Sequence, residues 1–246
     1  MTATVTARVL GVLAAFSAER TELTLTEIGR RAGLPLSTAH RLVGELTGWG
    51  ALERGDDGRY RIGLRLWEVA SLAPRTLGLR ESAMPFLADL HEVTGENVQL
   101  AVLDGTEVVY VERISGRGAV NVITRVGGRL PLHATGVGLV LLAHAPPGLQ
   151  EKVLAGPLQR YTAKTICAPE EVRRTLADVR RTGVAVSDGQ IELIALSVAA
   201  PVRGPRGDVV AALSVVVPSA GSDARAYVPA VRAAARGVSR TLRGGA

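Results

Sequence analysis

The sequence contains a single cysteine, Cys167, so it cannot form an intrachain disulfide framework. A chain of this kind suits a reducing compartment, and we expect a cytoplasmic protein. Aromatic residues make up only 3% of the chain, so its core must be built from alanine, valine and leucine. The most apolar run after the N-terminal helix, residues 134–145, has about half the length that a membrane-spanning helix needs. We therefore expect a globular protein without a membrane segment.

Lysine is also scarce, because Lys152 and Lys164 are the only two lysines and nearly all positive charge is carried by arginine. The formal net charge is +6, which suits an anionic partner. The first 65 residues nevertheless hold nine arginines against seven acidic residues, a net charge of +2. A basic surface in this part of the chain must therefore come from the placement of arginines rather than from their excess.

The sequence from residue 24 to residue 46 predicts two helices joined by a tight turn. Thr24 and Glu27 have the spacing of a capping box, which predicts that a helix begins at Leu25. That helix is expected to end at Gly33, before a Leu-Pro turn. In the second helix Ala39, Leu42, Val43 and Leu46 recur at helical spacing and form a buried stripe. An earlier helix is expected to place Val9, Leu10, Leu13 and Phe16 against the same core.

The opposite face of the second helix carries polar residues and residues with small side chains. It presents Ser37, Arg41 and Gly44, flanked by Thr38 and His40. Glycine inside a helix costs about 1 kcal/mol relative to alanine, but it permits the close approach of a large partner. Polar helix faces with arginine are often only solvated. The order of helix, capped helix, turn and helix favours a recognition helix in the DNA major groove.

A short hairpin follows the two helices. Residues 52–54 and 59–62 flank an Asp-Gly turn, which is a strong hairpin signal. Alternation along the strand predicts that Tyr60 and Ile62 face the core and that Arg59 points outward. Arg54 and Arg59 could then reach phosphates or a narrow minor groove. The segment therefore reads as a winged helix-turn-helix.

The remaining residues predict a linker and a second domain of mixed structure. Leu64, Leu66, Trp67 and Ala70 give a linker helix one apolar face. The following helices and strands do not alternate as regular βα repeats, so we expect an α+β fold with a mostly antiparallel sheet. Helices are expected at residues 80–94, 134–144, 169–182 and 226–242, and strands at residues 98–103, 107–114, 120–126, 198–202 and 209–217.

Motifs of the common enzyme classes are absent from the sequence. There is no G-x-S-x-G elbow, no P-loop and no G-x-G-x-x-G; the Gly136-Val-Gly138 segment lacks the third glycine. The four histidines and Cys167 do not have metal-ligand spacing, and we expect no cofactor. We therefore do not expect an enzyme.

Several segments together resemble the IclR family of transcriptional regulators over nearly the whole chain. They are residues 34–42 (LPLSTAHRL), 58–63 (GRYRIG), 94–96 (TGE), 109–113 (VYVER), 130–134 (LPLHA) with Gly136 and Gly138, and 199–202 (AAPV). The resemblance implies a winged helix-turn-helix in residues 1–63, a linker helix in 64–79, and a GAF-like effector-binding and oligomerisation domain in 80–246. It also implies a regulator, by expectation a repressor, that binds a pseudo-palindromic operator as a homodimer or a dimer of dimers.

Site residues follow from the resemblance, position by position. The implied DNA-contact residues are Ser37, Thr38, His40, Arg41, Arg59 and Tyr60, to which the hairpin pattern adds Arg54. The implied effector-binding residues are Leu132, His133, Ala134, Gly136, Ser187, Asp188, Ser197 and Ser214.

The sequence departs from the family pattern at the implied effector site. Residues 187–190 read SDGQ where many members carry more acid, and residues 194–197 read IALS where many carry a cysteine. These changes leave hydroxyl groups at the implied site in place of acids and a thiol. We expect a small organic effector there, either a carboxylate or an aromatic metabolite. His133 could face a ligand carboxylate or hold the loop together. The strand serines could instead bond each other or a buried water. The alternative function is a DNA-binding regulator whose second domain only oligomerises and binds no ligand.

Overall fold

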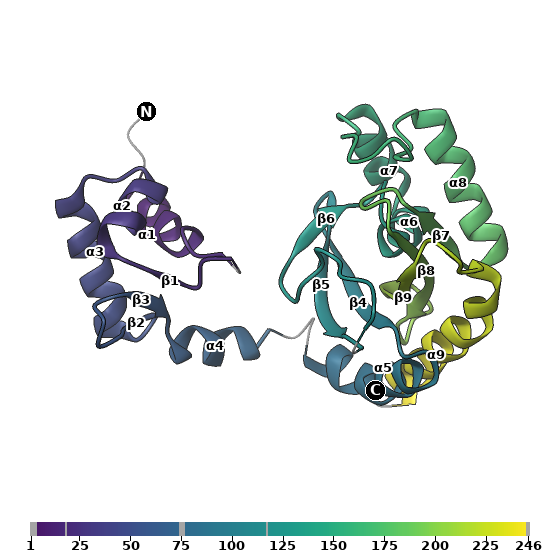
Figure 1. The fold of residues 1–246 in the computed structure, drawn as a ribbon, viewed down its shortest axis with the longest axis horizontal. Coiled ribbons are helices and arrows are strands. Elements are labelled where there is room, and N and C mark those ends of the chain that lie inside the picture. Colours follow the sequence, from purple (N-terminus) through teal and green to yellow (C-terminus); the bar gives the residue numbers. More distant parts are fainter. Residues whose placement is uncertain (1–3, 18, 74–76, 117, 245–246) are drawn as a thin grey trace. The chain divides into compact units, whose positions relative to one another are not determined.

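The helices of the first part of the chain begin and end at signals that the sequence carries locally. The computed structural model describes residues 4–17, 19–73, 77–116 and 118–244. The chain divides into two units, residues 1–77 and 78–246, which we describe separately (Figure 1). The first unit contains α1 (Val5–Ala14), β1 (Glu22–Leu23), α2 (Leu25–Ala32), α3 (Leu36–Trp49), β2 (Leu52–Arg54), β3 (Tyr60–Ile62) and α4 (Leu64–Ser71).

The capping box before α2 is present. The Glu27 amide donates to the Thr24 hydroxyl at 3.3 Å, and the Thr24 amide donates to the Glu27 carboxylate at 2.8 Å. These two bonds satisfy amides at the start of the helix that have no partner within it. The helix ends at Gly33, whose φ of 65° lies in the left-handed region that favours glycine. The predicted bounds of this helix are confirmed.

The core of the first unit is small and joins α1, α2, α3 and the sheet. In α3, Ala39, Leu42 and Val43 are buried and Leu46 is half-buried, which confirms the predicted stripe. In α1 the prediction for Leu10 is wrong, because this side chain is 59% exposed and Val12 is buried instead. Two residues along a helix turn the side chain by ~200°, so both cannot face the same core.

The hairpin forms two strands of a three-stranded antiparallel sheet with the order β1-β3-β2, in which β3 is central and β2 lies at an edge. Strand β1 has only two residues, and no sequence pattern signals it. Leu23 of β1 pairs with Tyr60, which is half-buried against the core as predicted. The prediction that Ile62 faces the core is wrong, because Ile62 is 43% exposed. It is the last residue of β3 and pairs with Leu52, but it is not among the residues that form or pack against the core of this unit.

The second unit is built on one large sheet. Its elements are α5 (Leu77–Thr94), β4 (Asn97–Asp104), β5 (Glu107–Ile114), β6 (Arg129–Pro131), α6 (Gly136–Ala143), α7 (Pro147–Ala155), α8 (Pro169–Thr182), β7 (Ala185–Asp188), β8 (Ala195–Arg203), β9 (Val209–Pro218) and α9 (Ala224–Gly244). The strand order is β6-β5-β4-β9-β8-β7, and every paired neighbour is antiparallel. The predicted α+β fold with an antiparallel sheet is confirmed.

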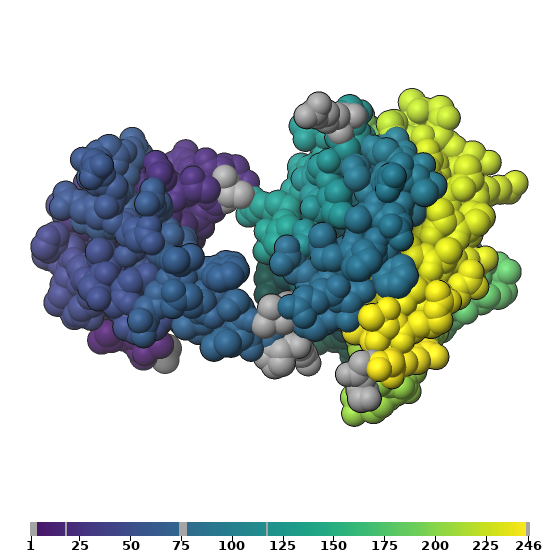
Figure 2. All heavy atoms as spheres, turned by 90° about the horizontal axis from the view of Figure 1, so that it is seen from below, coloured from purple at the N-terminus to yellow at the C-terminus, as the bar shows by residue number. Residues whose placement is uncertain are grey.

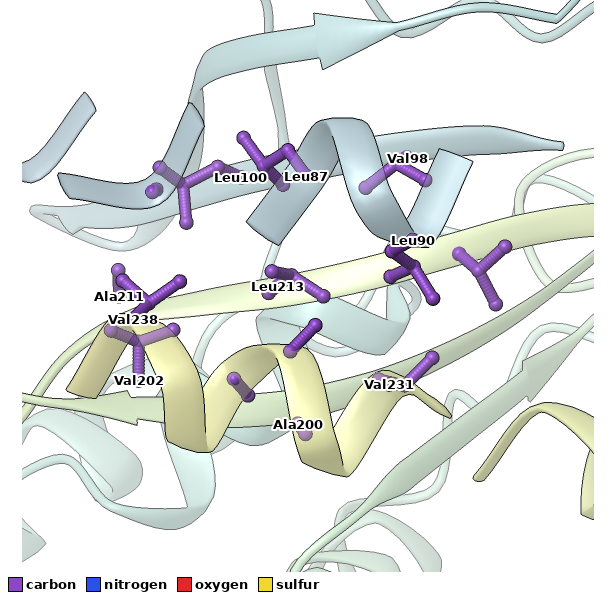
Figure 3. Packing of buried hydrophobic residues seen from close by; sticks show 14 of the residues in the cluster. Leu87, Leu90, Val98, Leu100, Ala200, Val202, Ala211, Leu213, Val231 and Val238 are labelled. Atoms are coloured by element: carbon purple, nitrogen blue, oxygen red, sulfur yellow. The ribbon is translucent and has the colours of Figure 1, made fainter. Parts of the chain in front are cut away.

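Helices cover both faces of the large sheet, and alternation along the strands divides the core in two. On one face α5 and α9 pack against the sheet, and Figure 3 shows Leu87 of α5, Leu213 of β9 and Val231 of α9 within one cluster. On the other face α6, α7 and α8 pack against side chains such as Ala212, the neighbour of Leu213. Helix α6 is buried along its whole length, as its uniformly apolar sequence predicts.

One predicted strand is absent. Residues 120–126 do not form a strand, and the strand that pairs with β5 is β6, at residues 129–131. The segment is held by side chains instead of by a backbone ladder. Asn97 donates to the carbonyl of Val120 at 2.8 Å, and Gln99 donates to the hydroxyl of Thr124 at 2.6 Å. The alternation of side chains in this segment arises because residues such as Val122 face the second unit while their neighbours face solvent. Strand β7 and helix α7 are not signalled by the sequence pattern.

Candidate DNA-binding face and ligand cavity

The outward side of α3 carries the four helical residues that the sequence singles out for DNA contact. Ser37, His40 and Arg41 are exposed and Thr38 is half-buried. A Cβ atom added to Gly44 would meet no atom within 4 Å, so the helix surface is open at that point. We call Ser37, Thr38, His40, Arg41 and Gly44 the recognition face.

Arg41 is held in place by its own helix. Its guanidinium donates to Glu45 at 2.6 Å, and both side chains are more than half exposed. An exposed pair at this spacing is worth about 0.3–0.5 kcal/mol. The pair therefore orients Arg41 but can exchange for a stronger acceptor outside the protein.

The β2–β3 hairpin, which we call the wing, carries the other three residues. The guanidinium of Arg54 lies 5.6 Å from the centre of the Tyr60 ring, its cross-strand partner. Arg59 lies 3.6 Å from both Glu27 and Asp57. Hydrogen bonds from the amide and then the hydroxyl of Thr24 lower the pKa of Glu27, with Arg59 adding a smaller effect. The capping carboxylate of α2 thus also anchors the wing. All seven residues predicted for DNA contact lie on α3 or the wing.

A cavity opens in the second unit between the start of α6 and one end of the sheet. It encloses about 410 Å³ of empty space, part of which is open to solvent. Its polar lining residues are Gln99, Tyr110, Thr124, Thr135, Ser187, Gln190, Glu192 and Ser197. Its other lining residues are Val122, Leu130, Ala134, Gly136, Val137, Ile191, Ala195 and Val216. We call this space the inner cavity.

The first turn of α6 brings backbone amides to the inner cavity. Thr135 caps the helix, since its hydroxyl accepts from Gly138 at 3.1 Å and its carbonyl accepts from Leu139 at 2.8 Å. Within the described residues, the amides of Gly136 and Val137 have no acceptor, and both residues line the cavity. The start of a helix carries a partial positive charge and suits an anion. The cavity can therefore receive a carboxylate at this point.

Ser197 of β8 lies directly against the start of α6. A Cβ atom on Gly136 would come within 2.7 Å of the Ser197 hydroxyl oxygen, so only glycine fits there. Ser197 is half-buried and lines the cavity. The Ser197 hydroxyl and the start of α6 thus lie side by side in the cavity lining.

The structure brings together four of the eight residues predicted for effector binding, namely Ala134, Gly136, Ser187 and Ser197. Ser187 is buried and donates to the carbonyl of Ala134 at 3.0 Å. This bond joins β7 to the segment that leads into α6.

The other four predicted residues do not line the inner cavity. Leu132 is part of the core beside α6. His133 is buried, its Nε2 lies 3.0 Å from the carbonyl oxygen of Gln159, and burial lowers its pKa. Asp188 accepts from Lys164 at 2.7 Å and from Ser219, and the Lys164 contact lowers its pKa most. Ser214 is fully buried, and its hydroxyl has no hydrogen-bond partner in the described structure.

Several lining residues were not predicted from the sequence. Gln99 lies on β4 and Tyr110 on the neighbouring β5, and both are buried; burial raises the pKa of the Tyr110 phenol, so that it stays neutral. Glu192 is a lining residue, and its carboxylate accepts from the amide of Ile123 at 3.0 Å, between the lining residues Val122 and Thr124. Among these residues, only Gln99 carried a signal in the sequence, because it is a polar residue inside the otherwise apolar run 98–103.

Among the described residues, no group of three or more histidine, cysteine or acidic residues is arranged to hold a metal ion. No helix in the same residues is long and apolar enough to cross a membrane.

Comparisons with known proteins cover both units. Residues 5–56 match a family model described as the IclR helix-turn-helix domain, and residues 73–240 match one described as the bacterial transcriptional regulator IclR C-terminal domain. The transcriptional regulator XynR of Escherichia coli is 34% identical over 209 residues, which cover 84% of this chain and 83% of XynR. The transcriptional repressor IclR of Escherichia coli is 31% identical over 198 residues, or 79% and 72% of the two chains. These relatives are regulators, not enzymes.

Solved structures agree with these matches. An IclR homologue from Microbacterium hydrocarbonoxydans, crystallised in complex with 4-hydroxybenzoate, is 45% identical and superposes with a TM-score of 0.94. The match covers 98% of this chain and all of that one. The IclR protein of Thermotoga maritima is 26% identical with a TM-score of 0.80, over 96% and 97% of the two chains.

Proposed function

Because the chain belongs to the IclR family of transcriptional regulators, we propose that it is a repressor whose operator affinity changes when a small organic carboxylate binds in the inner cavity. In this proposal residues 1–63 bind DNA, residues 64–79 link the two parts, and residues 80–246 bind the effector and oligomerise. The observation that carries the ligand part is the pair of amides at the start of α6, those of the cavity-lining residues Gly136 and Val137, which have no acceptor among the described residues.

The recognition face and the wing contact different parts of the DNA. Ser37, Thr38, His40 and Arg41 read base edges in the major groove, where an arginine can donate two hydrogen bonds to guanine. Arg54 and Arg59 reach phosphates beside the major groove, and the ring of Tyr60 holds the Arg54 guanidinium through a cation–π contact. The open surface at Gly44 supports this arrangement, because a side chain there would hold the helix away from the groove.

The lining of the inner cavity favours an aromatic carboxylate. The carboxylate would accept from the amides of Gly136 and Val137, while apolar neighbours such as Val122 and Val216 would contact the ring. Ser197 and Gln99 offer hydrogen bonds to further polar groups. The relative crystallised with 4-hydroxybenzoate supports this class of ligand.

The test is to measure operator binding with and without 4-hydroxybenzoate, in the parent and in the Ser197→Val variant. Operator DNA is first found by footprinting upstream of the protein's own gene. We expect the ligand to change the parent's operator affinity by about 5- to 150-fold, which is the usual range for coupled sites. Ser197→Val fills the wall beside α6 and should weaken the ligand response at least about ten-fold while leaving ligand-free DNA binding unchanged.

Two results would count against the proposal. If no aromatic carboxylate from a broader panel changes operator affinity, the second domain only oligomerises and the ligand part fails. If Ser197→Val keeps the parent's full response, the ligand lies outside the inner cavity. Val210→Ser, at an exposed position on β9 outside the cavity lining, is the matched control.

A further inference from the structure

The last helix of the chain has an unusual charge pattern. Helix α9 spans 21 residues and contains no aspartate or glutamate. Its basic residues are Arg225, Arg232, Arg236, Arg240 and Arg243. By contrast, two of the four arginines of α8 pair with acids on the same helix, Arg173 with Glu170 and Arg181 with Asp178. The arginines of α9 have no acid on their own helix to balance them.

The spacing of these arginines concentrates their charge on one side. Arg232, Arg236 and Arg240 follow one another at intervals of four, so they lie on one face of the helix. Like charges at this spacing destabilise a helix instead of supporting it. The negative end of the helix dipole favours Arg240 and Arg243 near the C-terminus, but it does not favour Arg232 and Arg236 in the middle. The stability of the helix therefore does not explain the pattern.

These arginines border a groove between α9, β8 and the end of α8. The groove encloses about 1000 Å³ of empty space that is partly open to solvent. Arg203 of β8 joins four arginines of α9 in its lining, and no acidic residue lines it. We call it the arginine groove. The opposite side of α9 faces the core through residues such as Val231 and Val238 (Figure 3), and Figure 2 shows the helix, in yellow, along the surface of this unit.

Two of the arginines are fixed in the groove by neutral partners. The backbone amide of Arg203 donates to the Ser239 hydroxyl at 2.9 Å, and its guanidinium donates to the carbonyl of Gly207 at 2.9 Å. Arg232 donates to the carbonyl of Thr182 at the end of α8. Carbonyl groups orient a guanidinium but do not neutralise it. Both side chains are half-buried, whereas Arg236 and Arg240 are exposed at the rim.

We infer that the arginine groove is a second ligand site, separate from the inner cavity, which binds the polyphosphate group of a small molecule. Five guanidinium groups in a lining that contains no acid favour an anion with several charges. Phosphate oxygens match the fork geometry of arginine and accept two parallel hydrogen bonds from it. Small residues in the lining, Ala200, Pro201 and Ala235, leave room for such a group beside the fixed arginines.

The experiment is calorimetric titration of the full-length protein with inorganic tripolyphosphate at physiological salt. The double variant Arg236→Gln/Arg240→Gln removes two rim charges without touching the anchored arginines. The control Arg174→Gln/Arg225→Gln removes the same charge at exposed positions outside the groove. We expect the groove variant to bind at least about ten-fold more weakly than the parent, and the control to remain within about two-fold. Adenosine triphosphate, titrated in parallel, identifies a nucleotide as the source if it binds more tightly, and free polyphosphate if it does not.

Three results would overturn the inference. The first is a parent protein that does not bind tripolyphosphate at physiological salt. The second is equal weakening in both double variants, which would mean that only the overall charge matters. The third is a groove variant that keeps the parent's affinity for tripolyphosphate but loses affinity for non-operator DNA, which would assign the arginines to a DNA surface. Circular dichroism of each variant checks that the fold is retained.

Discussion

Ser187 and Ser214 are both buried serines on the large sheet, but only Ser187 is hydrogen-bonded. A buried hydroxyl without a partner costs about 1–3 kcal/mol, while a typical hydrogen bond contributes about 1 kcal/mol. We therefore expect Ser214→Ala to raise the free energy of unfolding by about 1 kcal/mol and Ser187→Ala to lower it by a similar amount. Urea denaturation of both variants tests this. A loss of stability in Ser214→Ala would mean that a bound water satisfies that hydroxyl.

His133 makes the second unit sensitive to acid. Burial lowers its pKa below the ordinary value of 6.5, so the folded protein holds the neutral form. The unfolded chain takes up a proton as the pH falls through 6.5, and the folded chain does so only at lower pH. The free energy of unfolding should therefore fall between pH 7 and the lowered pKa. His133→Gln can still donate to the Gln159 carbonyl and should show a flatter pH profile in thermal unfolding. An equally steep profile in that variant would assign the acid sensitivity to other groups.

At the scale of single elements, α3 offers a test in which stability and binding move in opposite directions. Gly44 and Gly48 both lie on its outward side, and a Cβ atom at either would meet no atom within 4 Å. Alanine at either position should stabilise the helix by about 0.5–1 kcal/mol. Gly44 belongs to the recognition face, one turn after His40, whereas Gly48 lies a further turn away from the N-terminal part of the helix that contacts bases. Gly44→Ala should therefore weaken operator binding, while Gly48→Ala, the matched control, should not. Equal operator affinity in both variants would remove Gly44 from the interface.

Elements whose ends depend on neighbouring residues could be predicted from the sequence. Thr24, Glu27 and Gly33 define α2 through bonds that span at most a few residues, and α8 begins and ends at equally local signals, Pro169 in its first turn and the left-handed Gly183 after its last. The missing strand at residues 120–126 is the opposite case. Its alternation is real, but the segment is held by side chains of β4, more than twenty residues earlier in the chain. A local pattern does not distinguish such a segment from a strand.

The inner cavity could be predicted only in part, for a related reason. The pattern around residues 130–138 identified the start of α6, and two of the three strand serines line the cavity. The sequence did not show which face each strand residue takes, because that depends on pairing between distant strands. Ser187 faces the cavity while its neighbour Asp188 pairs with Lys164 and Ser219. Gln99 and Glu192 reach the cavity from elements that no motif marks.

At the scale of the whole molecule, the linker helix α4 predicts self-association. Leu64, Trp67 and Leu72 are 63%, 67% and 75% exposed, and no residue of α4 is buried. A second copy of the chain is the partner expected for a protein that reads a two-fold operator. Sedimentation should show a dimer or tetramer at micromolar concentration, and Trp67→Ser should weaken the assembly at least about ten-fold. A monomeric parent that binds a single half-site would contradict this prediction.

The strand order of the large sheet also bears on how the protein is made. Its central pair joins β4, at residues 97–104, to β9, at residues 209–218, so more than a hundred residues separate the two partners. During synthesis β4 and β5 leave the ribosome early, with one sheet edge still unpaired. The first unit, whose contacts are closer along the chain, can fold at that stage. The second unit must wait until its final strand emerges, so chains truncated before residue 218 should be prone to aggregate through β4.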